Sequence, residues 1–519
     1  MASRLANFWR VWKMARTLAR HDALFPAEYM ALMPSRVRLL RRLLGSGRVK
    51  DGTPGQRLAR ALESLGPAHI KLGQVLATRP DLVGIGVATA LEDLQDRLPS
   101  FPSAEARAVI AAEFGRPVEE MFVSFGEPVA AASIAQVHAA TTSDTPSKRV
   151  AVKVLRPGID AEFARDLETL AFAARLAERF WSEARRLRLT ALMQTLADST
   201  ALELDLRMEA AAASELAERM ADDERFRVPQ VDWTRTSQRV LTTEWIDGIP
   251  VRDIEGLKAA GHDPKDIALV LMRSFLTQAL REGFFHADLH PGNLFVDARS
   301  RLVVVDFGIM GRLDAGMRRF MAETLAGFLA RDYVRVAEMH FEAQFVPAHF
   351  PMDTFAQALR AVGEPIFGRP ARDLSMARVL QQLFETTRRF EMQAQPQLLL
   401  LQKSMVVVEG VARALDPDFD IWVAARPVVE RFMVERLSPQ ARLREIGEGL
   451  KMLGRALPQF VRNTETISRM LADGGLKLHP ETAHQIAEAE LHRTRFARIS
   501  LWLVAAAAGI GLVVWRVFF

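Results

Sequence analysis

The order of three chemically distinct segments constrains this chain more than any other feature. The first is an apolar strand with a single lysine, the second a loop with an acid and an amide, and the third an apolar strand that ends in an acid. Their functional residues are Lys153, Asp288 with Asn293, and Asp306. Since long stretches of helical periodicity surround these strands, we expect a mixed α+β fold.

Lys153 is the only charged residue in the apolar run 150–155. A lysine in a strand often simply faces solvent. The functional alternative is a lysine that reaches the phosphates of a nucleotide and is held by a carboxylate on a nearby helix. Glu203 and Glu209 lie in a helical stretch and either could be that carboxylate, so the sequence leaves the choice open.

The second segment places Asn293 five residues after Asp288. This is the spacing of a kinase catalytic loop, in which the Asp orients or deprotonates the attacking hydroxyl group and the Asn binds magnesium. Two alternatives are open. His286, Asp288 and His290 could bind a transition metal, or the segment could be a structural turn at Pro291 without chemistry.

The third segment ends at Asp306, within an Asp-Phe-Gly tripeptide that is a weak signal by itself. The runs 294–296 and 302–305 can form a hairpin, which would bring Asp306 next to Asn293. A carboxylate and an amide oxygen, completed by phosphate oxygens and water, suit Mg²⁺. The sequence therefore predicts a magnesium site formed by Asn293 and Asp306.

The loop ahead of Lys153 lacks the glycine pattern with which protein kinases cover phosphates. Residues 129–138 are rich in alanine, which reaches positive φ far less readily than glycine, so we expect a stiff loop and unusual nucleotide binding. After Asp306, no Ala-Pro-Glu segment is present to dock a peptide, which disfavours protein substrates.

Helical periodicity dominates residues 160–220 and 314–346. The apolar run 398–408 is interrupted by Gln402 and Lys403, so we interpret it as a buried core helix and not as a membrane span. Strands are expected only in the middle of the chain, at residues 122–125, 137–141, 150–155, 240–245, 294–297 and 302–305.

The C-terminus has the features of a membrane anchor. Residues 499–515 carry no charge and could just span a bilayer, which predicts a single transmembrane helix at 499–519. Three arginines within residues 493–498 keep the catalytic part in the cytoplasm by the positive-inside rule. The alternative is a buried C-terminal core helix.

The N-terminus is strongly basic, because residues 1–60 hold 13 Lys and Arg against 3 Asp and Glu. Apolar residues from Leu5 to Trp12 form one stripe of a helix whose other faces are basic, which is typical of a helix on an anionic membrane surface. A mitochondrial presequence is an alternative, but no cleavage signal follows. No nucleic-acid motif follows either, so we expect no nucleic-acid partner.

The chain contains no cysteine. Disulfide scaffolds, thiolate metal sites, iron-sulfur clusters and cysteine nucleophiles are therefore excluded.

Together these residues resemble a known family, the UbiB-type atypical kinases of ubiquinone biosynthesis, over roughly residues 65–417. Ala212 departs from the family pattern, in which an asparagine is expected, so we assign no ligand role there. The most specific marks are Lys71-Leu72-Gly73-Gln74, the alanine-rich loop with Gln136-Val137-His138, the Glu203-x-Asp205 pair with Glu209, and the segment 286–293.

The resemblance implies an α+β, bilobal protein-kinase-like fold with a helical N-terminal extension over the nucleotide site and a C-terminal transmembrane helix. The implied parts are a membrane-surface segment at 1–60, the extension at 61–115, an N-lobe with inserted helices at 116–245, a C-lobe at 246–440, C-terminal helices at 441–498 and the anchor at 499–519.

The resemblance also implies binding of ATP (or ADP) with Mg²⁺ and a role in ubiquinone biosynthesis at a bacterial inner membrane. The implied partners are anionic membrane lipids, a ubiquinone precursor or quinone-synthesis enzymes, and, as an option, a second copy of the chain. The candidate catalytic residues are Asp288, Lys153 and Lys71, and the candidate metal ligands are Asn293 and Asp306. The candidate nucleotide-binding residues are Ala130, Ala131, Ala132, Ser133, Ile134, Ala135, Gln136, Val137, Lys153, Glu203, Glu209 and, near adenine, Glu244.

Our working hypothesis is a membrane-anchored kinase-like ATPase. A small-molecule hydroxyl kinase of the aminoglycoside or choline kinase type shares the pattern of Asp288, Asn293 and Asp306 and is the first alternative. The second is a nucleotide-sensing scaffold that organises membrane-bound enzymes without turnover.

Overall fold

The structure is a computed structural model, and the chain divides into two compact units, Met1–Met433 and Val434–Phe519. The predicted C-terminal helices and the predicted anchor at 499–519 lie outside the described residues. The structure describes residues 2–23, 51–77, 83–92, 94, 99–180, 185, 188–364, 385–386, 389–392 and 396–437.

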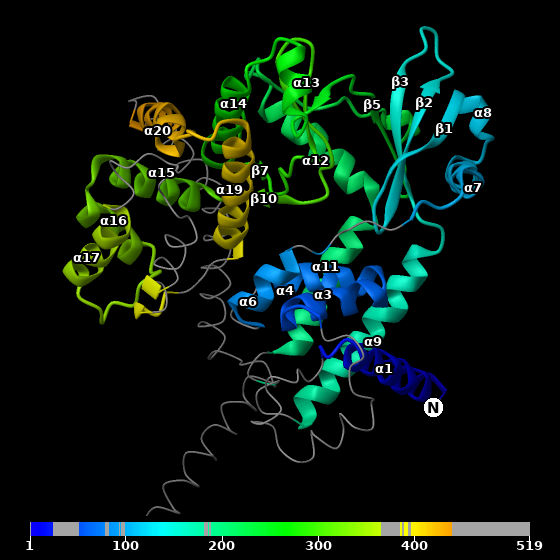
Figure 1. Cartoon of the computed structure of the whole chain (residues 1–519), viewed down its shortest axis with the longest axis horizontal. Helices are drawn as coiled ribbons and strands as arrows, with labels where there is room; N and C mark the ends of the chain where they lie inside the picture. Colours follow the sequence, from blue (N-terminus) through cyan, green and yellow to red (C-terminus); the bar gives the residue numbers. More distant parts are fainter. Residues whose placement is uncertain are drawn as a thin grey trace, which may run out of the picture. The chain divides into compact units, whose positions relative to one another are not determined.

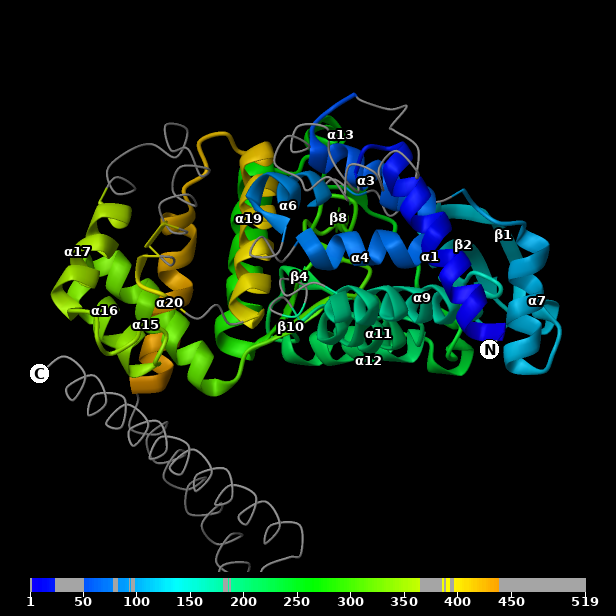
Figure 2. The same ribbon diagram turned by 90° about the horizontal axis from the view of Figure 1, so that it is seen from below.

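A group of helices at the start of the chain packs against the long helix α9 (Figures 1 and 2). One of them, α3, starts behind a capping box in which Thr53 and Gln56 each accept a hydrogen bond from the other's backbone N–H. The helices are α1 (Ala2–Arg20), α3 (Pro54–Leu65), α4 (Pro67–Ala77), α6 (Ile85–Glu92) and α9 (Ile159–Phe180).

A four-stranded antiparallel sheet has the strand order β1-β2-β3-β5. α7 and α8 pack beside it, and α9, α11 and α12 are inserted between β3 and β5 (Figure 1). The new elements are α7 (Ser103–Phe114), α8 (Val118–Met121), β1 (Phe122–Ala131), β2 (Ala135–Thr142), β3 (Arg149–Leu155), α11 (Leu189–Glu203), α12 (Leu206–Arg219), η2 (Trp233–Arg235) and β5 (Val240–Glu244).

Two smaller sheets are formed by strands that follow α12 in the chain. One has the order β4-β9-β8-β6, and the other pairs β10 with β7. Their elements are β4 (Phe226–Arg227), β6 (Ile249–Pro250), α13 (Ile254–Ala259), α14 (Pro264–Leu276), the π-helix η3 (Thr277–Glu282), β7 (Phe284–His286), β8 (Leu294–Val296), β9 (Leu302–Val304) and β10 (Met310–Arg312).

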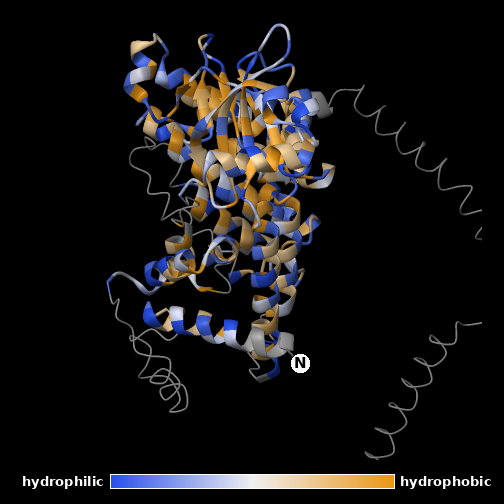
Figure 3. Cartoon of the chain, turned by 90° about the vertical axis from the view of Figure 1, so that its right-hand side faces the viewer, coloured by the Kyte–Doolittle hydropathy of each residue, from blue (hydrophilic) through white to orange (hydrophobic). Residues whose placement is uncertain are grey.

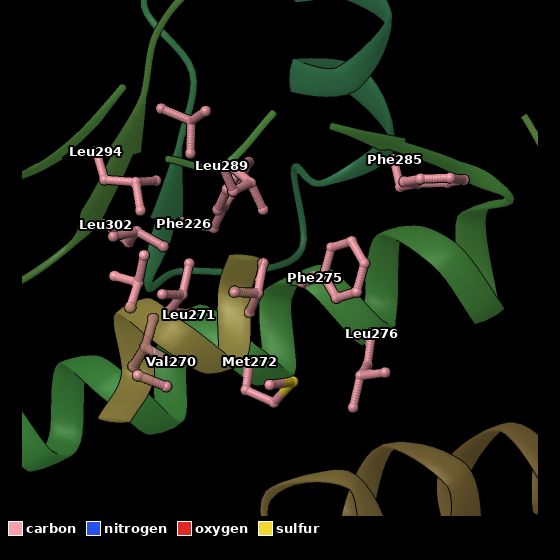
Figure 4. Packing of buried hydrophobic residues seen from close by; sticks show 14 of the residues in the cluster. Phe226, Val270, Leu271, Met272, Phe275, Leu276, Phe285, Leu289, Leu294 and Leu302 are labelled. Carbon is pink, nitrogen blue, oxygen red and sulfur yellow. The ribbon is translucent and has the colours of Figure 1, made fainter. Parts of the chain in front are cut away.

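The largest apolar cluster joins these small sheets to α14 and to the helix α19 (Figure 4). Figure 3 shows hydrophilic and hydrophobic bands that alternate along the helices, as expected where a helix buries one face. The remaining helices are α15 (Ala315–Ala330), α16 (Tyr333–Glu342), α17 (Met352–Gly363), α19 (Pro396–Leu415) and α20 (Ile421–Leu437).

The strands and helical stretches that were expected within the described residues are confirmed, with shifted ends. The stretch 160–220 contains three described helices, and 314–346 contains α15 and α16. The run 398–408 is a core helix, because Leu401 and Val408 of α19 are buried in the largest cluster. In the described part of the chain, no helix is both long and apolar enough to cross a membrane.

The extent of the predicted alanine-rich loop is wrong. β1 continues to Ala131 and β2 begins at Ala135, so only residues 132–134 form the turn. β1 continues into the alanine run because its backbone pairs with β2 there, with Ala130 opposite Val137 and Ala131 opposite Gln136.

Candidate active site

Lys153 lies in β3 and meets a carboxylate from α12. Its Nζ donates to Glu209 Oε1 at 2.8 Å and to Glu209 Oε2 at 3.0 Å. The two side chains are only 16% and 9% exposed. Of the two carboxylates that the sequence offered, Glu209 is therefore the partner of Lys153.

Glu203 pairs with the other lysine. Lys71 of α4 places Nζ 2.5 Å from Glu203 Oε1, with both side chains mostly buried. Gly73 lies on the same helix, where an added Cβ would collide with the side chains of Leu94 and Leu62. A glycine at this position therefore permits the close packing of α4 against Leu62 of α3 and Leu94.

A break between α11 and α12 separates the two carboxylates. Glu203 is the last residue of α11, and Asp205 caps α12 by accepting a hydrogen bond from the Arg207 N–H at 3.1 Å. The Arg207 side chain also donates to Asp205, which holds the pKa of Asp205 below its ordinary value. The contacts of Asp205 are thus a helix cap and an ion pair with Arg207, whereas Lys71 and Lys153 pair with Glu203 and Glu209.

His286 connects the loop of Asp288 to the strand end at Asp306. Its Nε2 lies 2.8 Å from the backbone carbonyl of Asp306, and its Nδ1 lies 3.1 Å from the Asp288 N–H. Since a carbonyl only accepts and an N–H only donates, Nε2 carries the proton and Nδ1 is the acceptor. Burial lowers the pKa of His286, which keeps this neutral form.

These bonds argue against the transition-metal alternative. Both ring nitrogens of His286 are occupied, and His290 Nδ1 accepts from the Gly292 N–H at 3.0 Å. Within the described ranges, no group of three or more His, Asp or Glu residues is placed to hold a metal ion.

Asn293 and Asp306 flank the predicted hairpin, which is formed by β8 and β9 with Leu294 opposite Val304. Asn293 Nδ2 donates to the Asp288 carbonyl at 3.1 Å, which leaves its Oδ1 for another partner. Asp306 has a left-handed backbone with φ 65°, a strained conformation for a non-glycine residue that is common at functional sites. The hairpin prediction is confirmed.

Asp306 also reaches the lysine, because Lys153 Nζ lies 3.0 Å from Asp306 Oδ1. The positive charge of Lys153 holds the pKa of Asp306 well below its ordinary value. Burial raises the pKa of Glu209 to about 7, against the opposing effect of Lys153. Burial also opposes the charge of Lys153, but Asp306 and Glu209 together outweigh it and raise its pKa.

The turn 132–134 is the part of the predicted nucleotide loop that is not strand. Its first N–H, of Ala132, donates to the Ala135 carbonyl at 2.8 Å. Within the described structure, the N–H groups of Ser133 and Ile134 have no acceptor. Free backbone N–H groups in a tight turn can bind an anion such as a phosphate.

Two predicted nucleotide-binding side chains are occupied by protein contacts. Gln136 is buried and exchanges two hydrogen bonds with the backbone of Phe101, at 2.9 and 3.1 Å. Glu244 ends β5, and its carboxylate pairs with Arg227 of β4. The backbone of both residues remains in strands that border the site, but their side chains have structural partners.

Comparison with known proteins assigns this arrangement to a class. Residues 93–340 match the family model of the ABC1 atypical kinase-like domain, and residues 359–420 match that of the UbiB helical domain. The mixed α+β fold is therefore that of an atypical kinase-like protein.

Proteins of similar sequence identify the family within this class of atypical kinase-like proteins. A Marinobacter nauticus protein described as a probable protein kinase UbiB is 41% identical over 429 residues, which are 82% of this chain and 77% of the relative. A protein of the same description from Xanthomonas euvesicatoria pv. vesicatoria is 40% identical over 90% of this chain and 85% of its own. The chain belongs to the UbiB family of atypical kinases.

One solved structure is also similar. It is a Mycobacterium tuberculosis protein in complex with erythromycin, which aligns at 24% identity with a TM-score of 0.49 over 76% of this chain and 97% of that chain.

Proposed function

We propose that this protein is a membrane-associated kinase-like ATPase that binds ATP and Mg²⁺ and supports ubiquinone biosynthesis. The cluster of Lys153, Glu209 and Asp306 carries the proposal, because it places a lysine between two carboxylates at the end of the hairpin that holds Asn293. Phosphoryl transfer depends mainly on positioning and on neutralising charge, which such a cluster can supply.

The donor set fits a hard divalent cation. The free Oδ1 of Asn293 and the carboxylate of Asp306 are both oxygen ligands, the kind that Mg²⁺ prefers. When bound, Mg²⁺ would neutralise charge on the nucleotide phosphates. The low pKa of Asp306 keeps its carboxylate ionised at neutral pH, as a metal ligand requires.

Other side chains of the site would contact the phosphates and orient the attacking group. Lys153, held by Glu209, contacts the phosphates, and Asp288 orients the attacking hydroxyl group or water. Asp288 is suited to this role because its side chain is 41% exposed while its backbone is fixed by His286. The N–H groups of Ser133 and Ile134 would bind phosphate oxygens from the other side.

The acceptor is proposed to be water or a small molecule. The ion pair of Lys71 with Glu203 lies one helix break away from Glu209, on the side where the N-terminal helices pack. A covering of this kind limits access for a folded protein substrate. The missing Ala-Pro-Glu segment supports the same conclusion.

The membrane role rests on the ends of the chain. In α1, Trp9 is 69% exposed, and Lys13, Arg16 and Arg20 are exposed beside it. This combination suits the surface of an anionic bilayer. We propose that it acts together with the apolar run 499–515, with the catalytic part in the bacterial cytoplasm.

The test is ATP turnover by the purified full-length chain with anionic lipid vesicles. We expect Asp306→Asn to abolish phosphate release, because the amide loses the charge that holds the metal. The matched control is Asp353→Asn, which changes an exposed residue in the first turn of α17. Equal turnover by wild type and Asp306→Asn would refute the metal assignment.

A genetic experiment separates catalysis from scaffolding. In a deletion strain that lacks this protein and makes no ubiquinone, Asp288→Ala should fail to restore the quinone although it is expressed at the wild-type level. Full restoration by Asp288→Ala would favour the non-catalytic scaffold.

A further inference from the structure

Arg156 connects the alanine-rich turn to the segment that follows the N-terminal helices. It comes directly after β3, and its Nη2 donates to the Ala132 carbonyl at 2.9 Å and to the Pro99 carbonyl at 2.7 Å. Its Nε also approaches the Ala132 carbonyl at 3.3 Å. A planar guanidinium group can hold two carbonyls in a fixed geometry, which a lysine cannot do.

The backbone of Arg156 completes the attachment. Its N–H donates to the Ile134 carbonyl at 2.8 Å, so contacts with this one residue engage the carbonyls at both ends of the turn. Its own carbonyl accepts from Arg239 Nη2 at 3.1 Å. The turn 132–134 is therefore bound to a residue that the sheet itself holds in place.

The segment around Phe101 is held by the same group of contacts. The Arg156 guanidinium lies over the Phe101 ring, 5.5 Å from its centroid. The Phe101 N–H and carbonyl both bond to the side chain of Gln136, which is 1% exposed. The connection from the N-terminal helices thus lies against the turn and against β2 simultaneously.

We propose that Arg156 is a positioning residue of the nucleotide site. It fixes the peptide planes of the turn 132–134, so that the N–H groups of Ser133 and Ile134 stay available to phosphate oxygens before nucleotide arrives. It also joins the turn to the connection at Pro99, so the turn and the N-terminal helices move together. The inference rests on the proposed function in one respect, namely that this turn contacts the nucleotide.

The experiment compares three variants of the full-length chain. Arg156→Gln removes both the positive charge and the planar guanidinium group, whereas Arg156→Lys keeps the charge but loses the guanidinium group. Arg107→Gln is the matched control, because Arg107 also donates to a backbone carbonyl, that of Phe125, and lies over an aromatic ring, but its contacts are with Phe125 and Glu119 and not with the turn 132–134. Melting temperature is measured for each variant to verify folding.

Hydrogen exchange without nucleotide tests the attachment itself. The Ala132 and Phe101 N–H groups, which are bonded in the structure, should exchange faster in Arg156→Gln than in wild type or Arg107→Gln. Exchange at the wild-type rate in both segments would overturn the proposal, whatever the fate of the proposed function.

Nucleotide binding tests the consequence. For Mg²⁺·ATP we expect the Kd to rise about 10-fold in Arg156→Gln and about 3-fold in Arg156→Lys. In these variants the turn is no longer fixed beforehand, so the free-energy cost of ordering it reduces the free energy of nucleotide binding. The kcat at saturating ATP should stay within about twofold of wild type, because Arg156 does not touch the reacting atoms. An unchanged Kd in a folded Arg156→Gln would overturn the positioning role, whereas failure of the wild type to bind ATP would overturn the proposed function.

Discussion

The choice of Glu209 as the partner of Lys153 leads to the sharpest prediction. Glu209→Gln removes a buried carboxylate that makes two contacts to Lys153 Nζ, at 2.8 and 3.0 Å. Breaking a buried ion pair costs about 3–5 kcal/mol when the remaining charge has no other partner. Here Lys153 keeps Asp306 at 3.0 Å, so we expect a smaller loss, about 2 kcal/mol of transition-state stabilisation.

That loss corresponds to roughly a 30-fold decrease in kcat/KM for ATP. Lys153 would also stay closer to Asp306 and compete with Mg²⁺, so the metal concentration for half-maximal turnover should rise. The comparison variant is Glu203→Gln, which disrupts the Lys71 pair and should cost only about threefold, because it is Lys153 and not Lys71 that pairs with Asp306.

The assay is phosphate release from ATP over a range of Mg²⁺ concentrations, with purified full-length variants on anionic vesicles. Melting temperatures show whether each variant is folded at the assay temperature. Turnover by Glu209→Gln within a factor of about three of wild type would refute the role of Glu209 in holding Lys153. A larger loss of turnover in Glu203→Gln than in Glu209→Gln would refute it equally.

Three further predictions concern single sites. Burial lowers the pKa of His69 to about 4, so as pH falls below 6.5 the unfolded chain binds a proton before the folded protein does, and the free energy of unfolding falls by about 2 kcal/mol by pH 5. His69→Leu should lack this loss, and an equal drop in melting temperature between pH 8 and pH 5 for wild type and variant would contradict the prediction. Gly311→Ala should destabilise the fold by about 1–3 kcal/mol, seen in denaturant unfolding, because a Cβ would collide with the Phe285 ring. Asn293→Ala should lower turnover at least about 100-fold at low Mg²⁺ and recover in part at high Mg²⁺, and a deficit that is independent of Mg²⁺ would count against a ligand role.

The strands of the core could be predicted from the sequence because they are short apolar runs bounded by turn residues. The hairpin 294–304 is an example, since its register follows from two apolar runs with a polar turn between them. The residues at which the strands begin and end were less predictable. β1 continues to Ala131 because its backbone pairs with β2 there, and its mostly exposed side chains in that stretch give no pattern of burial to read.

Side-chain partners in the site were predictable only in part. Periodicity could not choose between Glu203 and Glu209, because a continuous helix would have placed them differently from the two helices that are present. Asp205 was the one sequence signal for a break between two helices, since an Asp followed by helical residues often marks an N-cap. For Gln136 no local signal existed, because its partner Phe101 lies 35 residues away in the chain.

The break between α11 and α12 explains how one short stretch can serve two lysines that are far apart in the sequence. In a single straight helix, residues 203 and 209 would be separated by about 9 Å along the axis and by 240° around it, and so would point in different directions. The cap at Asp205 ends that regular rotation, so the orientation of each carboxylate is set by the packing of its own helix. Glu203 can then follow α11 toward Lys71 on α4, while Glu209 follows α12 toward Lys153 on the sheet. If the proposed function holds, a movement of the N-terminal helices that displaces Lys71 would pull on Glu203 at the end of α11, next to the helix that carries Glu209 and so next to the partner of the lysine proposed to bind phosphate.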